Sequence, residues 1–400
     1  MTAPASSDNG ALVVPANSSP TVLDLIRHHD GISRAEVARR IAVTRQAVSK
    51  IVSDLVAQGL VTETGTRPNG VGRAPTGLTL IPSSRFALGV HLDRSGALVI
   101  LVDLAGAVCG QVSRTTPVLP PGEYVEVLAG AVDELLAQVP GAAGRTVGCG
   151  VGMAGPVDHH TGVATAPNNF ANWRDVPIGD LLGRRLGLPV ALDKETNMAL
   201  MARDWAIDHD GWSIVLFVGT GIGGAVMLDG EIYRGPHSDA AELGHMILDP
   251  AGPPCVCGRR GCVEVFTSPA AVVQAYTQPD QADTTPRWSS STRDALRRIV
   301  AAADAGERHA IDTLAAAGAR LAVAASNAVR LLDIDDVVLT GPLLDEYGPR
   351  FVEAVEANLS WTDGARARGA KLSVSAQMQP TAIARGAAIS VLRTVGVGGA

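Results

Sequence analysis

Four metal-binding side chains lie within eighteen residues of one another in the middle of the chain. His245 ends the run Glu242-Leu-Gly-His, and three cysteines follow in Cys255-Val-Cys-Gly-Arg-Arg-Gly-Cys-Val-Glu264. Zn²⁺ accepts three thiolates and one imidazole in a closed tetrahedral structural site. Glycine tolerates a positive φ, so the two glycines of the run let the backbone turn tightly enough for the thiols to converge. The spacing predicts structural Zn²⁺ rather than ordinary buried thiols, with the ligands His245, Cys255, Cys257 and Cys262.

The segment from residue 21 to residue 80 is basic, although the chain as a whole is acidic. It carries eight Arg or Lys residues against five Asp or Glu residues, a net charge of +3, in a chain whose formal net charge is -7. A basic segment on an acidic body is typical of a local anion-binding domain. The overall charge argues against a chain that coats nucleic acid or anionic membrane along its whole surface.

Helical periodicity in this basic segment predicts three short helices between residues 21 and 61. Ser33 and Glu36 form a predicted capping box at the start of the second helix, and Thr44 is the predicted N-cap of the third. The short connection through Ile41 to Val43 is typical of a helix-turn-helix. Many such turns carry glycine where this chain has Ala42, so a left-handed Ala42 would cost about 1 kcal/mol.

The third predicted helix would present its N-terminal residues to base edges in the major groove. Strands on either side of residues 69–75 predict a β-hairpin wing that reaches the DNA backbone or minor groove. The alternative is a small solvated helical bundle used for protein contacts; charge, caps and wing favour double-stranded DNA. The predicted DNA-contacting residues are Arg34, Arg45, Gln46, Ser49, Lys50 and Arg73.

After Phe86 the pattern becomes α/β. Residues 87–92, 97–104 and 111–118 are predicted strands, followed by a helix over 123–138 and a strand over 147–151. A second set of strands begins at Ile214 and ends in helices in the last hundred residues. The repetition predicts two similar lobes. The expected organisation is a disordered leader over 1–20, a winged helix-turn-helix over 21–82 and a body over 83–400.

The metal-site pattern resembles the Glu-x-Gly-His and Cys-x-Cys-Gly-x-x-Gly-Cys-x-Glu signature of the ROK family of repressors and sugar kinases. Further family motifs lie at residues 152–158, 166–173, 219–224 and 386–388, and the head resembles the winged head of ROK repressors. The resemblance spans residues 21–395 and implies the actin-like, hexokinase-type ATPase fold. It also implies that Glu242, His245 and Glu264 hydrogen-bond sugar hydroxyls, with His245 serving both metal and ligand.

The chain departs from the family's kinases at the nucleotide side. Where kinases carry Asp-x-Gly-Gly-Thr, this chain has His91-Leu-Asp93-Arg-Ser95, which lacks both glycines and adds the negative charge of Asp93. Where kinases carry Asn-Asp-Ala-Asn, with Asp as general base, it has Lys194-Glu195-Thr-Asn197. Glu195 keeps a carboxylate one methylene longer, and Lys194 replaces an asparagine that helps hold the sugar. A shift of about 1 Å can cost a hundredfold in rate, so we expect no catalysis.

The favoured hypothesis is a cytoplasmic transcriptional regulator, a repressor of carbohydrate-related genes, that acts as a homodimer or higher oligomer. A sugar-like effector would bind through Lys194, Glu195, Glu242, His245 and Glu264, and operator DNA would be the second partner. Two alternatives stay open: an active ROK sugar kinase, and a DNA-binding repressor whose body is an unliganded oligomerisation scaffold. No apolar run approaches the roughly 18 residues of a membrane span.

Overall fold

A computed structural model describes residues 19–64, 76–94, 96–167, 170, 172–206, 211–278, 284–367, 369–375 and 378–395. The chain divides into two compact units. Unit 1 comprises residues 1–208 and 383–400, and unit 2 comprises residues 209–382. Among the described residues, no helix combines the length and apolar character that a membrane crossing requires.

The N-terminal part of unit 1 is a winged helix-turn-helix, which we call the head. Three helices pack around a core that includes Val22, Ile26 and Leu55, and a small sheet of order β1-β3-β2 supports them. Strands β2 and β3 form the base of the predicted wing, and residues 65–75 between them lie outside the described residues. The elements are α1 (Ser19–His28), β1 (Ile32–Ser33), α2 (Arg34–Arg40), α3 (Arg45–Ala57), β2 (Val61–Thr64) and β3 (Gly77–Leu80).

The caps of the head explain where its helices begin. Ser33 accepts a hydrogen bond from the Glu36 N–H, and Thr44 accepts one from the Ala47 N–H, as predicted. The serine half of the predicted capping box is therefore confirmed. The Glu36 side chain contacts Arg39 and Arg40. Ala42 has a φ of +54°, the left-handed conformation that costs an L-residue about 1 kcal/mol or more.

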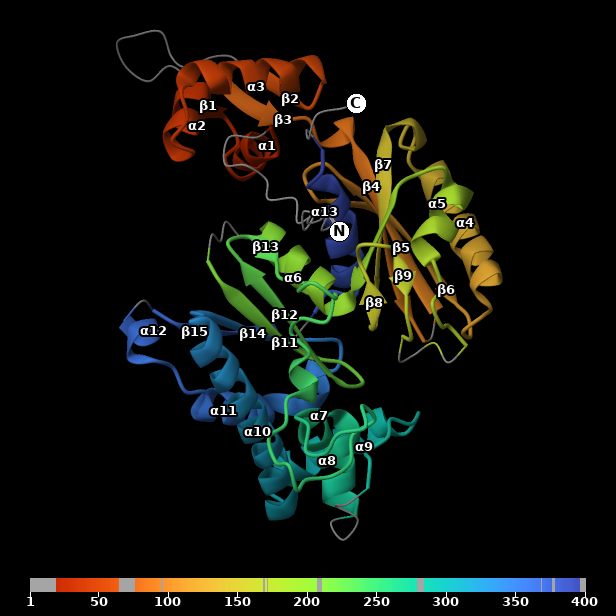
Figure 1. Cartoon of the computed structure of the whole chain (residues 1–400), viewed down its shortest axis with the longest axis vertical. Coiled ribbons are helices and arrows are strands. Elements are labelled where there is room, and N and C mark those ends of the chain that lie inside the picture. The colour runs from red at the N-terminus through yellow and green to blue at the C-terminus, as the bar shows by residue number, and fades with distance from the viewer. Residues whose placement is uncertain are drawn as a thin grey trace, which may run out of the picture. The chain divides into compact units, whose positions relative to one another are not determined.

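The rest of unit 1 is a five-stranded sheet of order β10-β7-β4-β5-β6. The sheet consists of β4 (Phe86–Asp93), β5 (Gly96–Asp103), β6 (Val108–Thr115), β7 (Thr146–Met153) and β10 (Val190–Lys194). Apolar side chains of alternate β4 residues pack on α4 (Pro121–Gln138) and α5 (Ile178–Leu186). The opposite face carries α13 (Ala382–Leu392), as Figure 1 shows.

Glycine permits the close approach of α13 to this sheet. A Cβ at Gly89 or Gly150 would lie 1.9 Å from the carbonyl oxygen of Ala384 or Ala387. Helix α6 (Glu195–Ala206), which follows β10 directly, packs beside α13, where Gly386 leaves room for the Met198 carbonyl. The family motif around Gly386 is therefore explained by helix packing, because a side chain there would collide with the α6 backbone.

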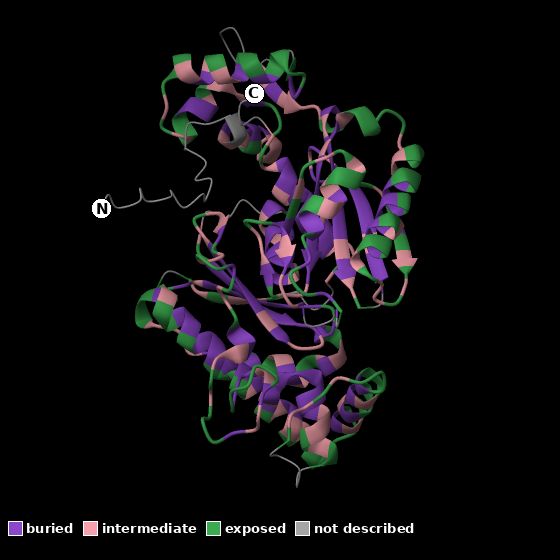
Figure 2. Ribbon diagram, turned by 45° about the vertical axis from the view of Figure 1, so that its right-hand side comes forward, coloured by how far each residue is buried: buried purple, intermediate pink, exposed green. Residues whose placement is uncertain are grey.

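Unit 2 contains a second five-stranded sheet of order β13-β12-β11-β14-β15. Its long core helix α10 (Arg308–Leu332) packs with α8 (Pro269–Thr277), α9 (Thr292–Asp304) and α11 (Gly348–Asn358) against the sheet. Figure 2 shows buried residues concentrated in the strands. The strands are β11 (Ser213–Val218), β12 (Ile222–Leu228), β13 (Glu231–Ile232), β14 (Asp336–Thr340) and β15 (Lys371–Ser375).

The two sheets share one topology. In each, three strands form an antiparallel meander, and two later strands add in parallel beside the first strand of the meander. The prediction of two similar α/β lobes is confirmed. Strands β10, β14 and β15 were not among the predicted strands, because short buried parallel strands carry no alternating pattern that separates them from helix.

Candidate metal centre, ligand residues and DNA-binding surface

The predicted metal ligands converge in unit 2. The ligand atoms of His245, Cys255, Cys257 and Cys262 all lie within 4.8 Å of one another. Cys255 Sγ is 3.6 Å from His245 Nδ1, and Cys257 Sγ is 3.6 Å from Cys262 Sγ. Two thiolates bound to Zn²⁺ at about 2.3 Å with tetrahedral angles would lie about 3.8 Å apart. The side chains therefore fit one tetrahedral ion.

The backbone of the loop explains this convergence. Gly258 and Gly261 have φ values of +84° and +66°, which glycine adopts without a Cβ penalty. A Cβ at Gly261 would lie 1.5 Å from the Asp249 carbonyl oxygen. The loop is fixed by hydrogen bonds from the Cys255 N–H to the Arg259 carbonyl and from the Val263 N–H to the Met246 carbonyl, of 2.8 and 2.9 Å.

Local hydrogen bonds favour a thiolate at Cys257. Although partial burial opposes the change, hydrogen bonds from the Arg259 backbone and side chain lower the pKa of Cys257 to about 6. Burial raises the pKa of Cys255 to about 12. Because the thiolate is the metal-binding form of cysteine, one ligand is ready near neutral pH, and binding would release protons from its neighbours.

Glu242, His245 and Glu264 lie close enough to interact electrostatically. Burial raises the pKa of Glu264, the Ile222 N–H and His245 oppose this, and Glu242 adds to it. Glu242 is exposed at the start of the short helix η3 (Leu243–His245), and Glu264 begins α7 (Glu264–Thr267). The three side chains that the resemblance implied for sugar binding are thus gathered beside the metal cluster within unit 2.

The glycine-rich turn between β11 and β12 orients Glu264. Its Oε2 accepts a hydrogen bond of 3.1 Å from the Ile222 N–H. A Cβ at Gly221 would lie 2.4 Å from that oxygen, so glycine is required for the carboxylate to approach. This role of Gly221 and Ile222 was missed from the sequence. The signal available was the family motif at residues 219–224.

In unit 1, Lys194 and Glu195 lie where β10 ends and α6 begins. Lys194 is 4 % exposed, and its backbone N–H donates to Asp193 Oδ1 at 2.7 Å. Asn197 Nδ2 donates to the same oxygen, also at 2.7 Å. Glu195 Oε2 lies 3.3 Å from His91 Nε2. Asp193 and His91 were not predicted as site residues, because only the fold brings β4 beside the start of α6.

The β4–β5 turn lies where the resemblance implies the phosphate loop of the family's kinases. Asp93 pairs with Gly96 in the antiparallel register, so the connection is a tight hairpin. Gly96 has a φ of +142°, and a Cβ there would lie 1.9 Å from the Arg114 carbonyl oxygen. The one glycine of this turn is therefore needed for the packing of neighbouring strands. In the family's kinases, the loop glycines instead allow the backbone to approach a phosphate.

Five of the six predicted DNA-contacting residues lie on two helices of the head. Arg45, Gln46 and Lys50 are exposed in the first turns of α3, and Ser49 is half-buried. Arg34, at the start of α2, forms an ion pair with Glu63 of β2, which joins this strand to the helix. Arg73 lies outside the described residues. The structure thus places four of the six predicted residues on one helix.

Two family models match the chain. One, described as the ROK family, matches residues 87–393. The other, described as the MarR family, matches residues 17–73, which include the three helices of the head.

Named relatives and solved structures agree with this division. A xylose repressor from Caldicellulosiruptor bescii is 25% identical over 339 residues, which cover 83% of this chain and 84% of that protein. A solved ROK family transcriptional regulator, a homologue of the E. coli MLC protein, has a TM-score of 0.78 at 22% identity and covers 94% of this chain and 96% of its own. A ROK hexokinase from Thermus thermophilus has a TM-score of 0.63 at 27% identity and covers 76% of this chain and 97% of its own.

Proposed function

The chain belongs to the ROK family, and on that premise we propose that it is a DNA-binding transcriptional repressor of carbohydrate-related genes that responds to a sugar. The observation that carries the proposal is the head, whose capped helix α3 exposes Arg45, Gln46 and Lys50. Arginine reads guanine and glutamine reads adenine in the major groove. A sugar kinase needs no such helix.

The effector is a polyhydroxylated small molecule bound by Glu242, His245 and Glu264. Carboxylates accept hydrogen bonds from sugar hydroxyls, and an imidazole whose Nδ1 faces a metal is fixed in orientation. The metal is structural Zn²⁺, because four protein ligands leave no open coordination position. Lys194 and Glu195 stay predicted ligand residues; the buried ammonium of Lys194 favours a ligand with a carbonyl or anionic group, since it donates but cannot accept.

The first experiment measures operator binding at fixed salt, with duplexes selected by the protein from a random-sequence pool. Arg45→Ala should weaken binding by about 1 to 3 kcal/mol and relax base preference at one position, whereas Arg73→Ala should weaken binding to all sequences alike. Unchanged binding in both variants would contradict the DNA-binding assignment. A homodimer on a two-fold related operator is the expected geometry.

The second experiment identifies the effector. D-xylose, D-glucose, N-acetylglucosamine and glucose 6-phosphate are added to the protein–operator complex, first with the parent and then with Glu242→Ala and Lys194→Ala. We expect one compound to change operator affinity by 1 to 3 kcal/mol, the range of ligand-driven switches. We expect it to lose its effect in Glu242→Ala. If none of these sugars acts on the parent, the body is an oligomerisation scaffold.

The second candidate function is ATP-dependent sugar phosphorylation, which the carboxylate of Glu195 beside His91 favours. We propose instead that the chain has no kinase activity. Asp93 adds negative charge where ATP phosphates would lie, and the glycines that let the backbone approach them are absent. Steady turnover of glucose or N-acetylglucosamine with ATP that disappears in Glu195→Gln would establish the kinase.

A further inference from the structure

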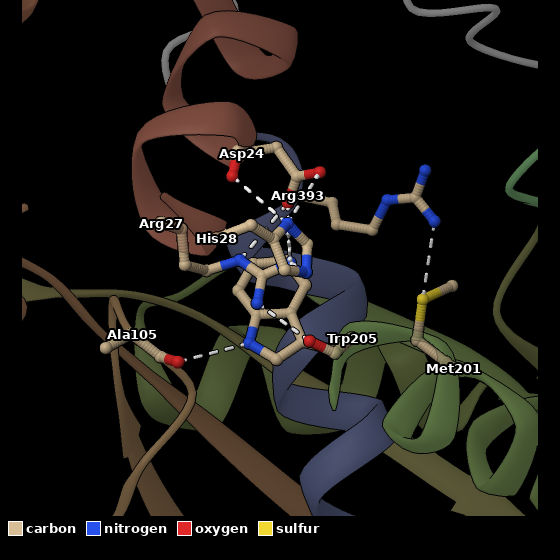
Figure 3. Close-up of polar contacts among 7 residues, drawn as sticks. All are labelled: Asp24, Arg27, His28, Ala105, Met201, Trp205 and Arg393. Carbon is tan, nitrogen blue, oxygen red and sulfur yellow. Dashed lines mark hydrogen bonds and ion pairs between the residues drawn. The ribbon is translucent and has the colours of Figure 1, made fainter. Parts of the chain in front are cut away.

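Helix α6 ends against helix α1 of the head, and Arg27 forms this contact (Figure 3). The Arg27 guanidinium carbon lies 3.6 Å from the centroid of the Trp205 ring. Arg27 Nη1 also donates a hydrogen bond of 2.7 Å to the Trp205 carbonyl oxygen. That carbonyl is in the last turn of α6, where carbonyl groups have no partner within the helix and a positive charge is favoured. One side chain therefore caps the helix and stacks on its aromatic residue.

Both partners are held from behind. Asp24, one turn before Arg27 on α1, accepts hydrogen bonds of 2.7 and 3.1 Å from the guanidinium. Trp205 Nε1 donates to the Ala105 carbonyl of the β5–β6 turn at 3.2 Å. A Cβ at Gly106 would lie 2.2 Å from the same nitrogen. The Arg27 side chain is 9 % exposed and Trp205 is 9 % exposed, so the contact is largely shielded from water. A cation–π pair is strongest when it is shielded in this way.

The opposite end of α6 carries Glu195, next to Lys194. Helix α6 has 12 residues, so about 18 Å separates its ends at 1.5 Å per residue. Its first turn packs on α13, because Gly386 lies against the Met198 carbonyl. A packed helix moves as a rigid element. A displacement at Lys194 and Glu195 would therefore reach Trp205.

We propose that Arg27 and Trp205 are positioning residues through which α6 orients the DNA-binding head. They contact no DNA themselves. This inference rests on the proposed function, since it explains how the state of the predicted ligand residues Lys194 and Glu195 would alter operator affinity. Loss of the contact between Arg27 and Trp205 would let the head reorient. Operator binding would then have to restrict that freedom, which would weaken operator affinity.

The test is a double-mutant cycle in the full chain, again with the selected operator duplexes at fixed salt. Arg27→Gln removes the cation and Trp205→Leu removes the ring. Each should raise the operator Kd about 3- to 10-fold, the effect of losing a partly buried cation–π contact. The double variant should have an operator Kd no higher than that of the more weakly binding single variant, because the two substitutions break the same interaction. Arg320→Gln is the matched control, since it removes a guanidinium 4.8 Å from the Phe266 ring in unit 2 and should leave Kd unchanged.

Amide hydrogen exchange separates positioning from loss of folding. In Arg27→Gln, the amides of α1 should exchange at least tenfold faster, whereas those of α3 keep their protection. Trp205→Phe, which keeps a ring for stacking, should restore most of the operator affinity lost in Trp205→Leu. An operator Kd and α1 exchange equal to those of Arg320→Gln would overturn the proposal, and so would faster exchange in α3, which would mean a destabilised head. If the parent binds no operator, the proposed function fails, and α1 exchange alone decides whether the pair holds α1.

Discussion

The two five-stranded sheets have the same topology, but their first turns have diverged. In unit 2, the β11–β12 turn keeps the glycine that lets Glu264 reach the Ile222 N–H. In unit 1, the β4–β5 turn follows Asp93, and its glycine serves strand packing. The shared sheets show that the architecture does not depend on these turns. Their chemistry is set by a few residues in each, and the proposed loss of ATP use together with retained sugar binding follows from that difference.

The largest expected effect is loss of the metal, which should destabilise part of unit 2 and leave the unit 1 sheet unchanged. We expect one zinc per chain by metal analysis. Cys257→Ser should lose it and unfold the loop that ends at Glu264, because structural zinc supplies several kcal/mol of folding free energy. Hydrogen exchange should rise over residues 245–264 and stay unchanged in the unit 1 sheet. Cys109→Ser is the control, since Cys109 is an exposed thiol far from the cluster in sequence. A Cys257→Ser protein as stable as the parent would contradict the metal assignment.

A smaller effect should follow from Gly221→Ala, which tests the unit 2 turn directly. The added Cβ would displace the Glu264 carboxylate from the Ile222 N–H, at a cost of about 1 to 3 kcal/mol in unfolding free energy. It should also abolish the response to the active sugar. Gly219→Ala is the matched control, because its nearest neighbour would be an edge carbon of the Phe217 ring at 3.2 Å.

A substitution in the β4–β5 turn of unit 1 should have little effect. Arg94→Ala in the β4–β5 turn should leave both stability and the sugar response near those of the parent, because that turn is proposed to hold no ligand. Urea unfolding and the operator assay measure the two quantities. A sugar response lost in Arg94→Ala and kept in Gly221→Ala would reverse the comparison of the two turns.

A pH-dependent effect concerns Asp204, next to Trp205 at the end of α6. Burial raises its pKa to about 6, Asp24 adds to this, and Arg393, Arg203 and Arg27 oppose it. Because the folded-state pKa lies above the ordinary value of 3.8, the stabilising contribution of Asp204 is present below about pH 4 and is lost as the pH rises through 6. Relative to Asp204→Asn, the parent should lose about 1 to 3 kcal/mol of unfolding free energy between these pH values. Parallel pH profiles in urea unfolding would contradict this.

Local sequence was sufficient to predict the helix caps and the metal cluster. Thr44 caps α3 as expected, because a cap depends on residues three apart in the chain. The four metal ligands lie within a short segment, so their convergence needs only tight turns. The MarR family match over residues 17–73 supports the winged-head interpretation that these local signals gave. The ligand roles of Lys194, Glu195 and Glu242 stay predictions.

Contacts between distant segments were decided only by the tertiary structure. His91 and Glu195 meet because β4 and β10 flank β7 in one sheet, and no local pattern encodes that order. Arg27 and Trp205 are separated by 178 positions in the sequence. The sequence alone indicates a cation on a helix surface for Arg27 and an ordinary core aromatic residue for Trp205. Sequence periodicity reports which face of an element is apolar, but it does not report which element covers that face. The residues that would position the head therefore became visible only after folding placed α1 at the end of α6.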